Sequence, residues 1–140
     1  MKISQTIELN EWESFQLKIP LHSNPIPDTI SMNRIEKIIN DDNDNIHLDH
    51  ILITIQPDTI FERLTWENIV NHLKAIPTEW HWQLLSMDNN HSIIIDMINV
   101  TRNDYGLYVL RTENSIGYSL MFIRLFIRGR CFFCIETADI

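Results

Sequence analysis

Apolar and polar residues alternate in two segments near the start of the chain. Every second residue of segment 15–21 is apolar, and a weaker alternation covers residues 3–9. A period of two predicts half-buried strands, because successive side chains of a strand point to opposite faces. Pro20 lacks an amide hydrogen and places the end of the second strand near a sheet edge.

Two later segments carry apolar residues at helical spacing. Isoleucines on one face follow Asp28, a favourable N-cap residue, and predict a helix over 29–40. The segment 59–76 has two capping signals, at Thr59 and Thr65, followed by a second apolar stripe. We therefore expect one broken helix or two short helices there, ending before a proline.

Strand patterns dominate the rest of the chain. Alternation or short apolar runs predict strands at 46–56, 80–84, 93–100, 107–110, 118–127 and 131–135. The short polar breaks between the later runs predict an antiparallel meander. Residues 118–127 also fit an apolar helix, since periodicity alone does not separate a short buried helix from a buried strand.

Together these elements predict an α+β fold. We expect a mainly antiparallel sheet of about six to eight strands with a C-terminal meander, and one or two helices packed on one face. The chain has 140 residues, which fits a single domain spanning 1–140.

Composition limits the expected cellular location of the chain and the kind of partner that it would bind. The formal net charge is −8, and the acids concentrate in the first hundred residues. A negative field repels phosphate backbones and anionic lipids and attracts basic proteins. No signal-peptide pattern and no run of 18 apolar residues is found, and two cysteines do not make a disulfide framework. A cytoplasmic location is expected.

Motifs for catalysis or for a cofactor are weak. Cys131 and Cys134 have redox spacing, but they fall in a predicted strand rather than at a helix N-terminus. His47 and His50 lack the further ligands of a metal site. Three glycines cannot build a phosphate-binding loop. We expect no metal and no cofactor.

The strongest candidate for a binding surface is acidic. Segment 41–45 is the most acidic loop, and a second group of acids near the N-terminus surrounds a tryptophan, the kind of aromatic anchor that interfaces favour. The predicted partner-binding residues are Asp41, Asp42, Asp44, Glu11, Glu13 and Trp12.

Size, acidity and the lack of catalytic motifs are similar to those of small inhibitor proteins such as bacterial immunity proteins. This similarity of composition implies a non-enzymatic inhibitor that neutralises a basic partner, such as a toxin with nuclease activity. One alternative is a structural or accessory subunit that self-associates through the edge of the 118–127 strand. A second alternative is a small enzyme with dispersed histidines and acids, whose pocket would hold His47, His81 or His91.

Overall fold

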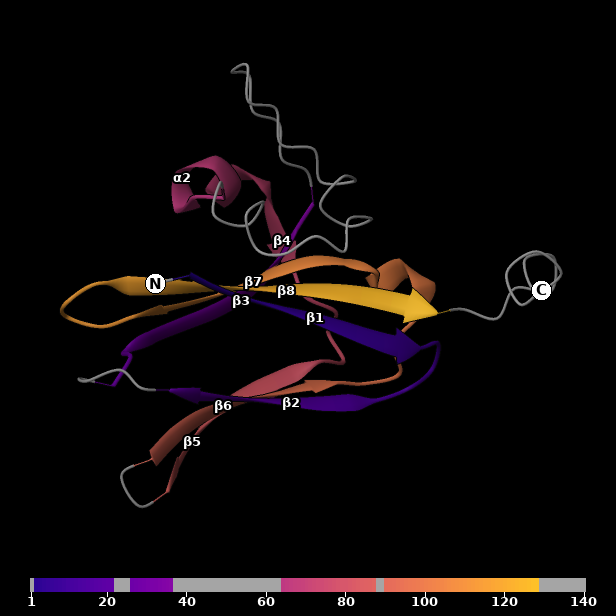
Figure 1. Cartoon of the computed structure of the whole chain (residues 1–140), viewed down its shortest axis with the longest axis horizontal. Helices are drawn as coiled ribbons and strands as arrows, with labels where there is room; N and C mark the ends of the chain where they lie inside the picture. Colours follow the sequence, from indigo (N-terminus) through magenta and orange to yellow (C-terminus); the bar gives the residue numbers. More distant parts are fainter. Residues whose placement is uncertain (1, 22–25, 37–63, 88–89, 129–140) are drawn as a thin grey trace, which may run out of the picture.

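The computed structural model describes residues 2–21, 26–36, 64–87 and 90–128, and its strands form two stacked sheets (Figure 1). One sheet has the order β1-β8-β7-β3-β4 and the other the order β2-β6-β5. The first sheet contains β1 (Lys2–Asn10), β8 (Tyr118–Arg128), β7 (Gly106–Glu113), β3 (Thr29–Ile35) and β4 (Leu73–Ala75). The second contains β2 (Phe15–Leu21), β6 (Asn90–Met97) and β5 (His81–Met87).

The pairing differs from the predicted meander. Strands β6 and β7 follow one another in sequence but lie in different sheets, joined by a crossing connection that contains the 3₁₀ turn η3 (Arg102–Asp104). Strand β1 pairs in parallel with β8, whereas the other described pairs are antiparallel. The described part of the chain is therefore mostly β, with two sheets and one short α-helix. The α+β prediction holds only in this loose sense.

The predicted helix over 29–40 is wrong over residues 29–36, the part of it that the structure describes. Residues Thr29–Ile35 form β3, which pairs antiparallel with β7 along its whole length. Met32 points into one apolar cluster and Ile35 into another, so both faces of the strand are covered. Long-range pairing outweighs the local helical spacing of the isoleucines.

The helix predicted within 59–76 is much shorter in the structure. Helix α2 (Trp66–Ile69) continues as the 3₁₀ turn η2 (Val70–His72), and the chain then becomes β4. The predicted cap at Thr65 is confirmed, because its hydroxyl accepts the amide of Asn68 while the Asn68 side chain accepts the amide of Thr65. The Thr59 signal lies outside the described residues, as do the predicted strands at 46–56 and 131–135.

Two apolar clusters explain why some strand segments have apolar residues at nearly every position. The first fills the space between the sheets and includes Leu17, Ile95 and Leu110. The second lies on the outer face of the five-stranded sheet, where Leu64 and helix α2 cover it (Figure 1). Strands β7 and β8 are therefore buried on both faces, which removes the alternation that a one-sided sheet would show.

The segment 118–127 is a strand, not a helix, but it is not an edge. Strand β8 lies between β1 and β7 and pairs with both. Its backbone amides and carbonyls are used inside the sheet, so the proposed self-association through this strand is wrong.

Candidate functional site

The β7–β8 hairpin projects a rigid apolar tip at one end of the sandwich. The Asn114 side-chain oxygen accepts the amides of Ile116 and Gly117 at 2.9 and 3.1 Å, and the Asn114 amide donates to the Gly117 carbonyl. An asparagine that bonds its own following backbone stabilises a tight turn. The turn holds the side chain of Ile116 at 78% exposure.

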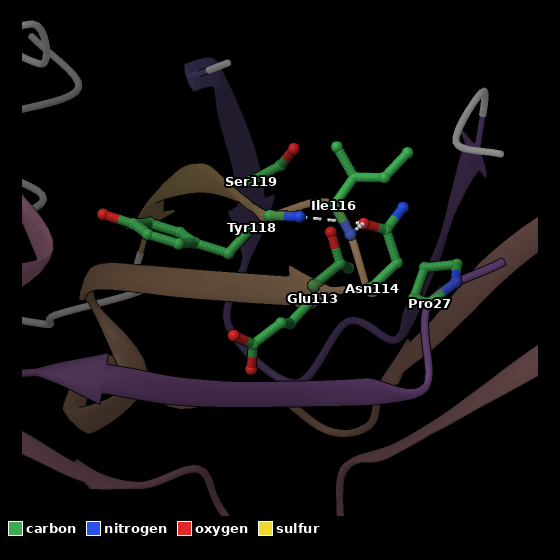
Figure 2. Close-up of a pocket in the computed structure, with 8 residues that line it drawn as sticks. Pro27, Glu113, Asn114, Ile116, Tyr118 and Ser119 are labelled. Carbon is green, nitrogen blue, oxygen red and sulfur yellow. Dashed lines mark hydrogen bonds between the residues drawn. The ribbon is translucent and has the colours of Figure 1, made fainter. Parts of the chain in front are cut away.

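A shallow hollow of about 270 Å³ opens beside this tip. Figure 2 shows Pro27 on one side of it and Glu113, Asn114 and Tyr118 on the hairpin side. The Asp28 amide donates to the Glu113 carbonyl at 2.9 Å, which fixes the start of β3 against the hairpin.

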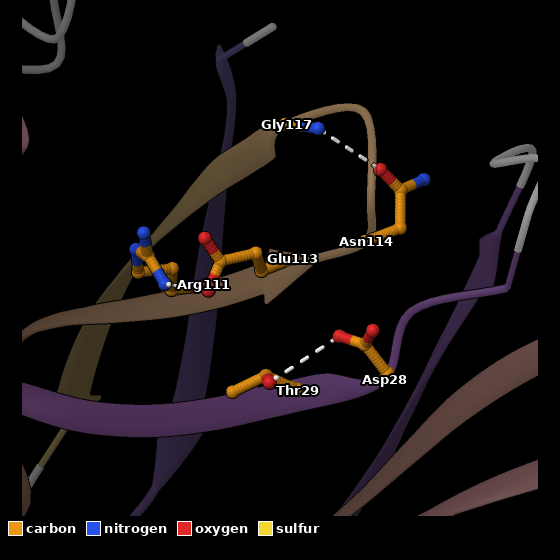
Figure 3. A network of polar contacts seen from close by, with 6 residues as sticks. All are labelled: Asp28, Thr29, Arg111, Glu113, Asn114 and Gly117. Atoms are coloured by element: carbon orange, nitrogen blue, oxygen red, sulfur yellow. Dashed lines mark hydrogen bonds and ion pairs between the residues drawn. The ribbon is translucent and has the colours of Figure 1, made fainter.

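The Arg111 guanidinium near the hairpin packs against two aromatic rings. The Arg111 guanidinium carbon lies 4.7 Å from the Trp66 ring centroid and 4.5 Å from that of Tyr118, so an aromatic ring of α2 and one of β8 both contact it. One Arg111 nitrogen pairs with the Glu113 carboxylate at 3.1 Å (Figure 3). Planar guanidinium suits stacking between rings better than ammonium does.

We expect Arg111→Lys to lower the free energy of unfolding by about 1–2 kcal/mol, because an ammonium keeps the charge but loses both stacked faces. Urea unfolding, followed by tryptophan fluorescence, measures this. Arg102→Lys is the matched control at an exposed position. Equal stability of the two variants would contradict the supporting role of the stack.

The partner-binding residues predicted from sequence lie elsewhere. Glu11, Trp12 and Glu13 occupy the β1–β2 turn, at the end of the sandwich opposite the hairpin (Figure 1). Trp12 is 67% exposed. The predicted Asp41, Asp42 and Asp44 lie outside the described residues. Sequence reasoning missed the hairpin tip because isolated Ile116 and Tyr118 carry no pattern that marks them as exposed.

Of the three histidines named in the small-enzyme alternative, His47 lies outside the described residues, and His81 and His91 lie on the β5–β6 hairpin. His81 registers with Asp96 and His91 with Ser86, so the two histidines do not face one another. The His91 ring nitrogen lies 2.7 Å from the Ser86 hydroxyl on an open hairpin. The β7–β8 hollow has no histidine in its lining. Within the described ranges no three metal-ligating side chains cluster, and no helix is long and apolar enough to cross a membrane.

The connection from β6 to β7 contains a side-chain-to-backbone hydrogen bond that is typical of one class of β-sandwich. The buried Tyr108 hydroxyl, near the start of β7, donates back to the Asp104 carbonyl at 2.5 Å. Such a tyrosine corner, in a sandwich of two packed sheets, is a hallmark of immunoglobulin domains. In antibody domains a cysteine follows two residues later, and here that position is the buried Leu110.

Solved structures agree with this assignment. The BTLA ectodomain superposes with a TM-score of 0.52 at 9% identity, covering 91% of this chain and 94% of that one. The titin Ig tandem A164-A165 superposes with a TM-score of 0.50 at 11% identity, covering 91% of this chain and 46% of that one. The second Ig domain of the mouse polymeric immunoglobulin receptor superposes with a TM-score of 0.50 at 10% identity, covering 91% of this chain and 99% of that one. The fold is immunoglobulin-like.

No protein-family model matches the sequence, and no curated protein is similar to it in sequence. The likeness therefore establishes the fold. It overturns the comparison with bacterial immunity proteins, because the structural neighbours are immunoglobulin-like domains. The inference of a toxin-neutralising inhibitor, drawn from charge and size alone, is wrong.

A sequence signal for the immunoglobulin-like fold was present. Asp104 and Tyr108 form the corner, but Leu110 replaces the cysteine that makes the pattern easy to notice. Strand β3 follows β2 into the other sheet, as strand C does in immunoglobulin domains, but it carries no tryptophan; Ile30 and Met32 face the core between the sheets. The buried Trp80 lies in this core, with its ring centroid 5.3 Å from that of Tyr108.

Proposed function

We propose that this chain is a non-enzymatic immunoglobulin-like binding domain that contacts a protein partner through the β7–β8 hairpin end. The observation that carries the proposal is the exposed apolar tip of Ile116, held over a stacked and ion-paired support. Interfaces favour an exposed apolar or aromatic centre within a polar rim.

The surroundings of the tip supply both parts of such an interface. Tyr118 is 43% exposed, and together with Ile116 it lines the hollow. Exposed Asp28 and the partly exposed Glu113 supply the polar rim. A preorganised surface loses little conformational entropy on binding, so the Asn114 turn and the Arg111 stack favour tight recognition.

Replacing the tip residue tests the proposal. Ile116→Asp is expected to weaken binding of a partner about tenfold or more, because it places an uncompensated charge at the centre of the buried contact. The measurement is quantitative co-purification from the native source, followed by mass spectrometry, with wild-type protein and variant compared at equal amounts. Thermal unfolding checks that the variant stays folded.

Leu85→Asp is the matched control, since Leu85 is 46% exposed on β5 of the other sheet. A partner retained by wild type and by Leu85→Asp but lost with Ile116→Asp supports the hairpin surface. A partner retained equally by all three proteins rules this surface out.

A further inference from the structure

A second hollow lies at the opposite end of the sandwich from the hairpin. It has a volume of about 360 Å³ and lies where the β1–β2 turn, the β4–β5 connection and the β6–β7 crossing meet. Its lining residues are Trp12, Glu79, Trp80, Ile98, Asn99, Thr101 and Asp104. All of them lie in described segments that pack on the core between the sheets.

The exposed Trp12 is held at this hollow by the backbone. Its amide donates to the Val100 carbonyl at 2.6 Å, and the Val100 amide donates to the Glu13 carbonyl at 3.0 Å. The Asn99 amide donates to the Ser14 hydroxyl from the other side. The turn is therefore joined to the β6–β7 crossing, so the indole is presented from a fixed platform while remaining 67% exposed.

The backbone conformation makes this presentation unusual. Trp12 has a φ of 71° and Asn99 a φ of 48°, and these are the non-glycine residues with positive φ in the described part of the chain. A bulky side chain in the left-handed region is disfavoured, because its Cβ approaches the backbone too closely. Both residues border the same hollow.

The charges around the hollow define what it would attract. The turn and the two connections carry four carboxylates, from Glu11, Glu13, Glu79 and Asp104, against the single guanidinium of Arg102. Two further arginines lie nearby. Arg34 donates to the carbonyls of Asn103 and Tyr105, and Arg128 lies 3.9 Å from the Glu8 carboxylate.

We infer that this hollow binds an arginine or lysine side chain from a basic segment of a partner protein. An indole face attracts a cation, and guanidinium more often than ammonium, while neighbouring carboxylates accept its hydrogen bonds. Glu79 is exposed and lies in the lining, so it is available to a ligand. One Asp104 oxygen accepts the Thr101 amide, which keeps that carboxylate in place beside the hollow.

The inference is independent of the hairpin surface, because the two sites lie at opposite ends of the strands and share no lining residue. Failure of the Ile116→Asp experiment leaves it untouched. It also keeps two of the acids predicted from sequence, Glu11 and Glu13, in a supporting electrostatic role next to Trp12.

A capped hexa-arginine peptide is the probe, with hexaglutamine as the neutral comparison. Binding is followed by calorimetry of the whole chain at low salt and again at higher salt. Trp12→Gly is expected to weaken binding about tenfold, because it removes the indole. Glycine adopts a φ of 71° without strain, so this variant keeps or raises the thermal midpoint.

Glu79→Gln tests the carboxylate and is expected to weaken binding severalfold. Its matched control is Glu67→Gln on helix α2, and Trp82→Ala on β5 is the control for the indole. Losses confined to Trp12→Gly and Glu79→Gln support the site. Equal losses for Glu79→Gln and Glu67→Gln, with none for Trp12→Gly, show general charge attraction and overturn it. Absence of binding to the wild type, or a Trp12-dependent dimer without peptide binding, also overturns it.

Discussion

Phe122→Ala is expected to lower the free energy of unfolding by about 3–5 kcal/mol, enough to unfold a large fraction of a marginally stable domain. Phe122 is fully buried on the outer face of the five-stranded sheet, in the cluster that includes Leu64 and Ile69. Truncation removes a large apolar side chain and leaves a cavity that the sheet cannot close, because neighbouring strands are fixed by their hydrogen bonds.

The matched control is Phe126→Ala, four residues along the same strand. Phe126 is half-buried and packs edge-on against Tyr105 at 5.5 Å, so its truncation should cost clearly less. Chemical unfolding of both variants gives the comparison. Equal losses would mean that helix α2 and Leu64 do not form a second core over this face.

Tyr108→Phe is expected to lower the free energy of unfolding by about 1–3 kcal/mol near neutral pH. The substitution keeps the ring against Trp80 and removes only the hydroxyl that donates to the Asp104 carbonyl. A buried acceptor left without its donor accounts for the loss. Tyr118→Phe is the control at a half-exposed ring, and we expect a change within about 0.5 kcal/mol.

The same variant has a distinct dependence on pH. Burial raises the pKa of the Tyr108 hydroxyl above its ordinary value; Arg34 acts against this shift and Asp104 acts with it. Above pH of about 10 the unfolded chain releases a proton that the folded chain retains, so wild-type stability falls by up to about 1.4 kcal/mol per pH unit.

Tyr108→Phe lacks this contribution, so the stability gap between the two proteins should narrow as pH rises above about 10. Unfolding midpoints measured between neutral and alkaline pH test the trend. A gap that stays constant across this range would show that the hydroxyl ionises equally in the folded and unfolded states.

Local patterns located most of the described strands. The alternation in 15–21 matches β2 residue for residue, and the Thr65 cap marks the start of α2. These features depend on neighbours in sequence, so they can be read without the fold. The run 118–127 was ambiguous for the same reason, because a strand buried on both faces has no alternation to detect.

The candidate sites were predicted less well. Trp12 and the acids beside it were identified from composition, but nothing local marks Trp12 as left-handed or places it beside Trp80 and Glu79. The hairpin tip was missed, because the exposure of Ile116 depends on Asn114 closing the turn away from the sheets. The tyrosine corner was readable in principle and was obscured by Leu110.

The sequence by itself determined the period-two strands, the helix N-cap at Thr65 and the excess of acids. Each of these follows from side-chain chemistry over a few residues or from composition. Only the tertiary structure decided that β3 is a strand, that β6 and β7 lie in different sheets, and that β1 runs parallel to β8. Those choices rest on hydrogen bonds and burial between segments far apart in the chain, which no local pattern encodes.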